Sequence, residues 1–221
     1  MKSLYVGKEL FAWQMRDLRR GGFSAGPLAG CRDSSSGPAP VVLTFDDGSR
    51  SVFRHAMPEL ARHRFQAIQF LVAEAIGGVN HWDIRDHQEA ADPLMDEVEI
   101  REWLAAGNEI GAHTLTHPFL TAIPEARARE EIFASKKMLE DRFGIAVRHF
   151  CYPYGKWNRR IRDLVEQSGY ETAVTLDFGV NGPGADPLAL RRIEAHHPSR
   201  NCRNLLALAA AGFPLRFFLQ R

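Results

Sequence analysis

The chain has 221 residues, of which 45% are hydrophobic and 25% charged, and this composition excludes a disordered, fibrous or membrane-spanning protein. Its 28 Lys and Arg residues nearly balance its 27 Asp and Glu residues, so the net charge of +1 gives no reason to expect nucleic acid as a partner. A chain of this length buries a sufficient core without structural metals, so a metal site here is expected to be functional.

The N-terminal region predicts a helix and a linker. The first 20 residues contain no uninterrupted apolar stretch, and no segment reaches the roughly 18 apolar residues of a membrane span. We therefore expect a cytoplasmic protein, or an exported one if the N-terminus is truncated. The spacing of Leu10, Trp13 or Gln14, and Leu18 predicts an amphipathic helix, and a stretch rich in Gly, Ser and Pro follows at 21–40. This pattern divides the chain into a helical arm and linker, 1–39, and one domain, 40–221.

From residue 40 onward, short β-branched runs alternate with longer amphipathic runs. This alternation is typical of parallel strands joined by crossover helices, and it predicts an α/β barrel or open sheet. The expected strands are 41–45, 66–72, 109–113, 147–151, 171–176 and 190–195. The expected helices lie near 51–63, 97–106, 124–143, 157–168 and 201–211.

Polar and aromatic side chains gather just after these strands, at the edge where parallel α/β proteins build their active sites. Asp46 and Asp47 follow the first strand, and His113 ends the third. The other candidates at strand ends are Tyr152, Tyr154, Asp177, His196 and His197.

Four of these residues suggest a metal site. Asp46 and Asp47 are adjacent carboxylates that point to opposite sides of a strand, although Asp-Gly is also a common turn. His113 and His117 are four residues apart, so one helical turn would place both imidazoles within reach of one ion. Two imidazoles and one carboxylate form a ligand set that binds zinc or a similar ion and leaves positions open for water and substrate.

Three strings in the sequence resemble a known family. They are TFDDGSRS at 44–51, EIGAHTLTHPFLT at 109–121 and CYPYGKWN at 151–158. In order, spacing and strand context they resemble the first three motifs of the polysaccharide deacetylase family, the NodB-homology or chitin-deacetylase-like hydrolases. Two more stretches, ELFAWQMRDLRRGGF and SKKMLEDRFG, resemble the bacterial exopolysaccharide branch of that family. The resemblance implies a distorted, incomplete parallel (β/α) barrel of six to seven strands, with the active site at the C-terminal strand ends.

The resemblance also implies roles for individual residues. Asp47, His113 and His117 would ligate a divalent metal, most readily Zn²⁺, with Co²⁺ or Ni²⁺ as alternatives, and Asp46 would be the general base. The backbone N–H of Tyr154 would hold the oxyanion, since Gly155 after it lets the backbone approach closely. The aromatic rings of Tyr152 and Trp157 are expected to flank the sugar.

The chain departs from the family pattern at three places. Cys151 stands where the third motif usually carries an Arg that orients the base, so the sequence does not say how Asp46 is held. The fourth motif is reduced to LDFG, which leaves Asp177 as a candidate partner for the residues around the metal. For the fifth motif, His196 or His197 is the candidate acid that protonates the departing amine, and loop histidines without a catalytic role are the alternative.

These features predict a metal-dependent hydrolase that removes N-acetyl groups from amino sugars of a bacterial polysaccharide, oligosaccharide or lipid-linked precursor. One alternative is a hydrolase of the same fold that cleaves another C–N bond, in a formamido sugar or a cyclic ureide. A second alternative is a degenerate, non-catalytic carbohydrate-binding module. The expected partner is an N-acetylated carbohydrate, and the sequence leaves homo-oligomerisation open.

Overall fold

The computed structural model describes residues 6–26, 28, 40–87, 91–182, 184–195 and 217–220. The expected helix at 201–211 and the candidate histidines His196 and His197 lie outside the described residues. Within this part of the chain, no helix is long and apolar enough to cross a membrane.

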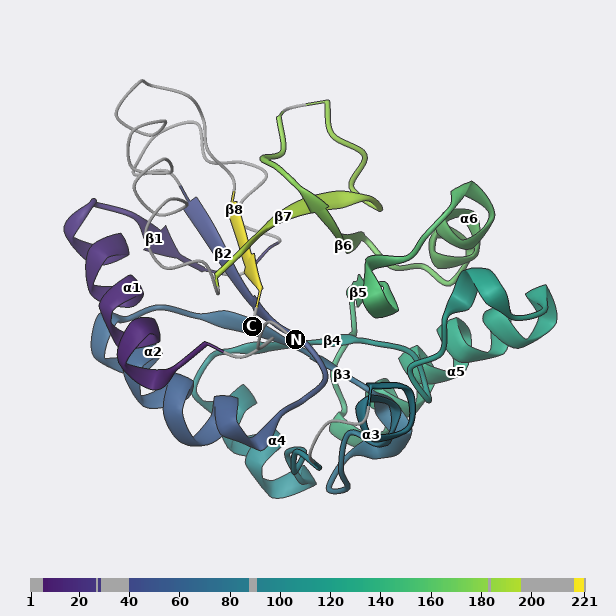
Figure 1. Cartoon of the computed structure of the whole chain (residues 1–221), viewed down its shortest axis with the longest axis horizontal. Coiled ribbons are helices and arrows are strands. Elements are labelled where there is room, and N and C mark those ends of the chain that lie inside the picture. Colours follow the sequence, from purple (N-terminus) through teal and green to yellow (C-terminus); the bar gives the residue numbers. More distant parts are fainter. Residues whose placement is uncertain are drawn as a thin grey trace.

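One parallel sheet forms the centre of the molecule (Figure 1). Its strands follow one another in chain order, and β8 also pairs with β2, so β2 to β8 close into a ring of seven strands. An ideal barrel of this type has eight strands, so the predicted distorted, incomplete (β/α) barrel is confirmed. The strands are β1 (Ser24–Ala25), β2 (Pro40–Phe45), β3 (Ala67–Leu71), β4 (Glu109–Ala112), β5 (His149–Cys151), β6 (Thr172–Phe178), β7 (Leu190–Glu194) and β8 (Phe217–Gln220).

Helices connect the strands and lie around the outside of the curled sheet (Figure 1). The α-helices are α1 (Lys8–Arg20), α2 (Met57–His63), α3 (His81–His87), α4 (Glu97–Ala105), α5 (Glu125–Phe143) and α6 (Arg159–Gln167). Shorter helical turns are the π-helical turn η2 (Val52–Ala56) and the 3₁₀ turns η3 (Ala73–Ala75), η4 (Leu120–Ala122) and η5 (Pro153–Gly155). All six expected strands are present, whereas the sequence analysis missed β1, β8 and α3.

The strands β3 and β5 are buried on both faces, as is typical of parallel strands. On one face of β2, Phe45 packs against Phe11 of α1 and Trp103 of α4. Because side chains alternate along a strand, Val42 on the other face points into the barrel, where it joins a second apolar cluster. The other members of that interior cluster are Leu28, Ile68, Phe70, Cys151, Val174 and Leu190.

The predicted N-terminal helix is α1, and it packs into the main core. Its apolar face buries Phe11, Met15 and Leu18. Its Gln14 is also buried and donates a hydrogen bond from Nε2 to the carbonyl oxygen of Ala195, 2.6 Å away. The division at residue 40 stays a prediction, but α1 belongs to the same packed core as the sheet.

Candidate active site

Four polar side chains converge at the carboxyl ends of β2 and β4. Asp46 and Asp47 follow β2, His113 follows β4, and His117 comes four residues later in a loop. All four are buried, with exposed fractions between 1% and 7%. Burying this many ionisable groups is costly unless they are paired or bind an ion, so the arrangement needs a chemical explanation.

Asp47, His113 and His117 form a compact triangle. Oδ1 of Asp47 lies 3.4 Å from Nε2 of each histidine, and the two Nε2 atoms are 3.1 Å apart. Ligand atoms bound tetrahedrally at the usual zinc distances are separated by about 3.3–3.4 Å, so these residues match a zinc-like ion in spacing. The three atoms can therefore form one face of a tetrahedron around such an ion.

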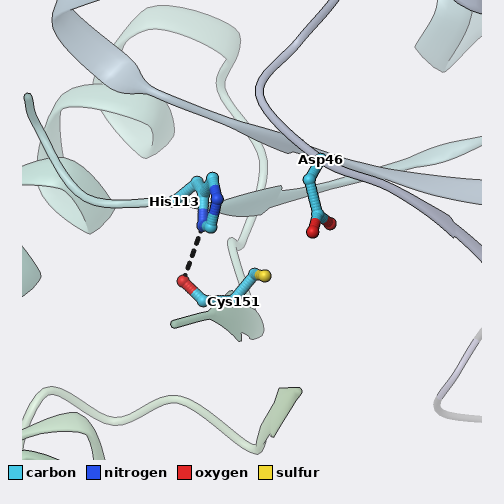
Figure 2. Close-up of side chains that lie close together, drawn as sticks. All are labelled: Asp46, His113 and Cys151. Atoms are coloured by element: carbon cyan, nitrogen blue, oxygen red, sulfur yellow. Dashed lines mark hydrogen bonds between the residues drawn. The ribbon is translucent and has the colours of Figure 1, made fainter. Parts of the chain in front are cut away.

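The hydrogen bonding of His113 fixes which ring nitrogen is available. Its Nδ1 lies 2.7 Å from the carbonyl oxygen of Cys151, an atom that only accepts hydrogen bonds (Figure 2). Nδ1 therefore carries a proton, and Nε2 is the ring nitrogen that faces Asp47 and His117. A histidine that binds a metal through one ring nitrogen commonly donates the other to a carbonyl oxygen, so this arrangement fits a divalent metal at this site.

The loop from His113 to His117 is not the helical turn that the sequence spacing suggested. Thr114 and His117 both have left-handed backbone angles, with φ of 69° and 62°. The N–H of His117 donates to Oγ1 of Thr114 at 3.0 Å. The two imidazoles still meet, because this left-handed loop turns the chain back on itself after β4.

Arg192 on β7 holds Asp46. Its Nη1 and Nη2 donate to the two carboxylate oxygens of Asp46 at 2.8 and 2.9 Å, and its Nε donates to the carbonyl oxygen of Thr175 at 2.8 Å. Nη2 also lies 3.4 Å from Sγ of Cys151. Asp46, Cys151 and the His113 ring all face the same interior space (Figure 2).

This ion pair is almost fully buried, with side-chain exposures of 1% for Arg192 and 3% for Asp46. Burial by itself lowers the pKa of Arg192, but the neighbouring Asp46 carboxylate reverses the effect and raises the pKa above its usual value. Arg192 therefore stays charged. The sequence analysis missed this residue. Leu190, two positions earlier on β7, belongs to the interior cluster, so the alternation of side chains along β7 was the signal that could have found Arg192.

The third motif forms the tight turn η5. Tyr154 and Gly155 both have left-handed backbone angles, with φ of 56° and 63°. The Tyr154 ring packs edge-on against His117 at 4.6 Å between centroids, and it stacks on Phe119 at 3.8 Å. Tyr154 thus lies beside the triangle of candidate metal ligands, and the oxyanion role of its N–H stays a prediction.

The comparison with known proteins agrees with this geometry. A family model described as "Polysaccharide deacetylase" matches residues 33–173, which is more than half of the chain and includes the two aspartates, both histidines and Tyr154. This chain belongs to the polysaccharide deacetylase family. The resemblance seen in the three sequence motifs is therefore confirmed.

Individual relatives differ in how much of the chain they share. YxkH of Bacillus subtilis is 26% identical over 196 residues, covering 86% of this chain and 66% of YxkH. A chitooligosaccharide deacetylase of Sinorhizobium fredii is 30% identical over 127 residues, covering 57% of this chain and 51% of that protein. The chain thus spans between about half and two thirds of the length of these curated relatives.

A solved structure supports the fold. IcaB from Ammonifex degensii superimposes with a TM-score of 0.79 at 24% identity, covering 92% of this chain and 89% of that chain. Identity at this level is evidence for the fold alone.

Two residues that the sequence analysis assigned to the site, Tyr152 and Asp177, have other surroundings in the structure than the predicted ones. Tyr152 is fully buried and donates its hydroxyl to the carbonyl oxygen of Leu188 at 2.8 Å, so its ring does not face a bound sugar. Burial also raises the pKa of Tyr152 well above its usual value, which keeps the hydroxyl neutral. Asp177 is exposed and accepts a hydrogen bond from Nε1 of half-buried Trp157 at 3.1 Å, so it supports Trp157 at the rim.

A pocket of about 250 Å³ opens beside the two aspartates. Its lining comes from α1, the end of β2 and the turn after it, η2, and the segment between β3 and α4. The apolar lining includes Phe11, Phe45, Val52, Ala56 and Leu94. The polar lining includes Asp46, Asp47, Ser49, Asn80, Asp83 and Asp92.

Proposed function

We propose that this chain is a metal-dependent hydrolase that removes N-acetyl groups from amino sugars of a glycan or its precursor. The observation that carries the proposal is the pairing of a metal-ligand triangle with a separate carboxylate, Asp46, fixed beside it by Arg192. A site that only bound sugar would gain nothing from a base held next to a metal.

Each group in the site has a distinct task in this reaction. Asp47, His113 and His117 would hold the ion, and a bound zinc-like ion supplies Lewis acidity toward the acetyl carbonyl and lowers the pKa of water. Asp46 takes the proton of the attacking water on one carboxylate oxygen. Each oxygen already accepts one N–H from Arg192, but a carboxylate oxygen has a second lone pair, so Asp46 is oriented without being saturated.

The remaining steps of the reaction fall to Tyr154 and to two histidines that lie outside the described residues. The backbone N–H of Tyr154 would hold the oxyanion, and His196 or His197 would protonate the departing amine. Phe119 is 37% exposed where it stacks on Tyr154, and half-buried Trp157 is braced by Asp177 on the same rim. Exposed aromatic faces pack well against pyranose rings, so these two rings are the proposed sugar contacts.

The test compares the wild type with Asp46→Asn, which keeps every proposed metal ligand and removes the base. We expect bound zinc in both proteins, acetate release from N-acetylglucosamine oligomers by the wild type, and at least a hundredfold lower kcat in the variant. Asp141→Asn is the matched control, because it neutralises an exposed carboxylate on α5 that pairs only with Lys137.

The other outcomes separate the alternatives. Bound metal without acetate release from any of these sugars would contradict N-deacetylation and favour hydrolysis of another C–N bond. Sugar binding without metal and without turnover would favour a carbohydrate-binding module.

A further inference from the structure

Glu131 on α5 is a fully buried carboxylate outside the deacetylase motifs. Its side chain has 0% exposure, on a helix face otherwise made of small or apolar residues such as Ala128, Ile132 and Leu139. Burying a carboxylate on such a helix face costs free energy. We therefore expect its hydrogen bonds to have a role that an apolar side chain could not fill.

Those hydrogen bonds go to the loop between the two metal-ligand histidines. Oε2 of Glu131 accepts the backbone N–H groups of Leu115 and Thr116, both at 2.9 Å. Oε1 accepts the hydroxyl of Thr116 at 2.7 Å and Nη2 of Arg127 at 2.7 Å. Both carboxylate oxygens are therefore used, and three of these donors belong to the middle of the loop.

The loop needs this support because its backbone is strained at both ends. A left-handed conformation is unfavourable for a residue other than glycine, and here Thr114 and His117 both adopt it. Such conformations persist only where the surroundings hold them. Without Glu131, the N–H groups of Leu115 and Thr116 lose their partner, and the loop is free to relax toward ordinary backbone angles.

We propose that Glu131 is a positioning residue that holds the Nε2 atom of His117 in metal-binding geometry through the backbone of residues 114–117. This inference rests on the proposed function, since it assumes that His113, His117 and Asp47 bind a metal. Glu131 touches neither the substrate nor the ion. It fixes the loop in the absence of metal, so that the 3.1 Å separation of the two Nε2 atoms is already set before binding.

The experiment compares Glu131→Ala and Glu131→Gln with the control Glu130→Gln. Glu130 is the adjacent, exposed carboxylate and also pairs with Arg127, so the control disturbs the same arginine without touching the loop. The measurements are the affinity of the metal-free protein for Zn²⁺ by competition with a chelator, the melting temperature of the metal-free protein, and the visible spectrum with Co²⁺, which reports ligand geometry.

We expect Glu131→Ala to bind Zn²⁺ about 10- to 100-fold more weakly than the wild type, the range typical of residues that orient metal ligands. Glu131→Gln keeps one carbonyl oxygen as an acceptor, so its Zn²⁺ affinity should lie between those of the wild type and Glu131→Ala. Both should show an altered Co²⁺ spectrum, and Glu130→Gln should behave as the wild type in every measurement.

A folded Glu131→Ala protein with wild-type Zn²⁺ affinity would overturn the inference, because a purely structural residue lowers the melting temperature alone. If Glu131→Ala does not fold, wild-type affinity in Glu131→Gln overturns it equally. A wild-type protein that binds no divalent metal would instead contradict the proposed function, and the metal role of Glu131 with it.

Discussion

At the scale of single residues, Asp46, the proposed base, is held by an arginine from a strand that the sequence analysis did not point to. Cys151 on β5 occupies the position where the family pattern has an arginine, and its sulfur lies 3.4 Å from the guanidinium of Arg192, which comes from β7. The small cysteine side chain leaves room for that guanidinium inside the barrel. In this chain Arg192 on β7 thus makes the contact with Asp46 that the family resemblance would assign to an arginine at position 151.

Arg192→Lys tests this contact. Lysine keeps the positive charge but cannot form the two parallel hydrogen bonds, so Asp46 becomes free to rotate. We expect kcat to fall roughly tenfold to a hundredfold, with little change in KM or in zinc affinity, because misplacing a catalytic group affects the chemical step.

The matched control is Arg191→Lys, since Arg191 is the exposed neighbour on the same strand. A kcat for Arg192→Lys equal to that of the control would show that Asp46 does not depend on Arg192 for its orientation.

Part of this site could be predicted from the sequence because four of its residues lie in two short motifs. Asp46 and Asp47 are adjacent, and His113 and His117 lie within one short motif, so local patterns reveal them. Arg192 is 146 residues from Asp46, and its role depends on barrel closure, which no local pattern encodes. Tyr152 was misplaced because the motif gives its position at a strand end but not whether its ring points inward.

At the scale of elements, the turn η5 is the most constrained connection near the site. Gly155 has a φ of +63°, and a Cβ added there would lie 2.4 Å from Cβ of Leu176 on β6. This turn therefore requires glycine for two reasons, the left-handed angle and the close approach of β6.

Gly155→Ala should consequently displace the turn that carries Tyr154. We expect a lower melting temperature, a loss of more than about 1–2 kcal/mol of stability, and reduced kcat. Gly144→Ala after α5 is the control, because Gly144 is also left-handed, at a φ of +69°, but an added Cβ meets nothing within 4 Å. Equal stability and activity in the two variants would contradict the steric argument.

The helices and strands that could be predicted from the sequence are those with a clear pattern of apolar residues. The strand β3 is an uninterrupted buried run, and α5 repeats apolar residues on one face and ends at left-handed Gly144. The strand β1 has only two residues, which is too short for any pattern. The helix α3 carries five ionisable residues among seven, so its sequence shows no apolar face from which a helix could be predicted.

At the scale of the whole molecule, acid stability depends on a histidine at the opposite end of the barrel from the active site. His149 begins β5, is buried, and hydrogen-bonds through Nδ1 to Oγ1 of Thr172 at 2.8 Å. Burial, helped by the charges of Arg148 and Lys136, lowers the pKa of His149 to about 4. The ring is therefore neutral at pH 7, and its contact with Glu109 at 3.7 Å is not an ion pair there.

This shift predicts how stability changes with pH. Between about pH 6.5 and pH 4 the unfolded chain binds a proton at His149 and the folded chain does not, so stability falls as the pH falls. The loss amounts to on the order of 3 kcal/mol across that window. Urea unfolding of His149→Gln should show a correspondingly flatter pH dependence, whereas parallel curves for the two proteins would refute the assignment. His55→Gln, at an exposed position, is the control.

Closure of the barrel by β8 has a consequence for the order of folding. One edge of β2 pairs with β1 and β3, but the other edge pairs with β8, whose residues lie at 217–220. During synthesis that second edge stays unpaired until residues 217–220 have been made, and an unpaired edge is where chains associate wrongly. Contacts between such distant segments form slowly, because the long intervening segment must close first. We therefore expect the hydrogen bonds between Arg192 and Asp46 to form late, so that Asp46 is fixed in place only as the ring of strands closes.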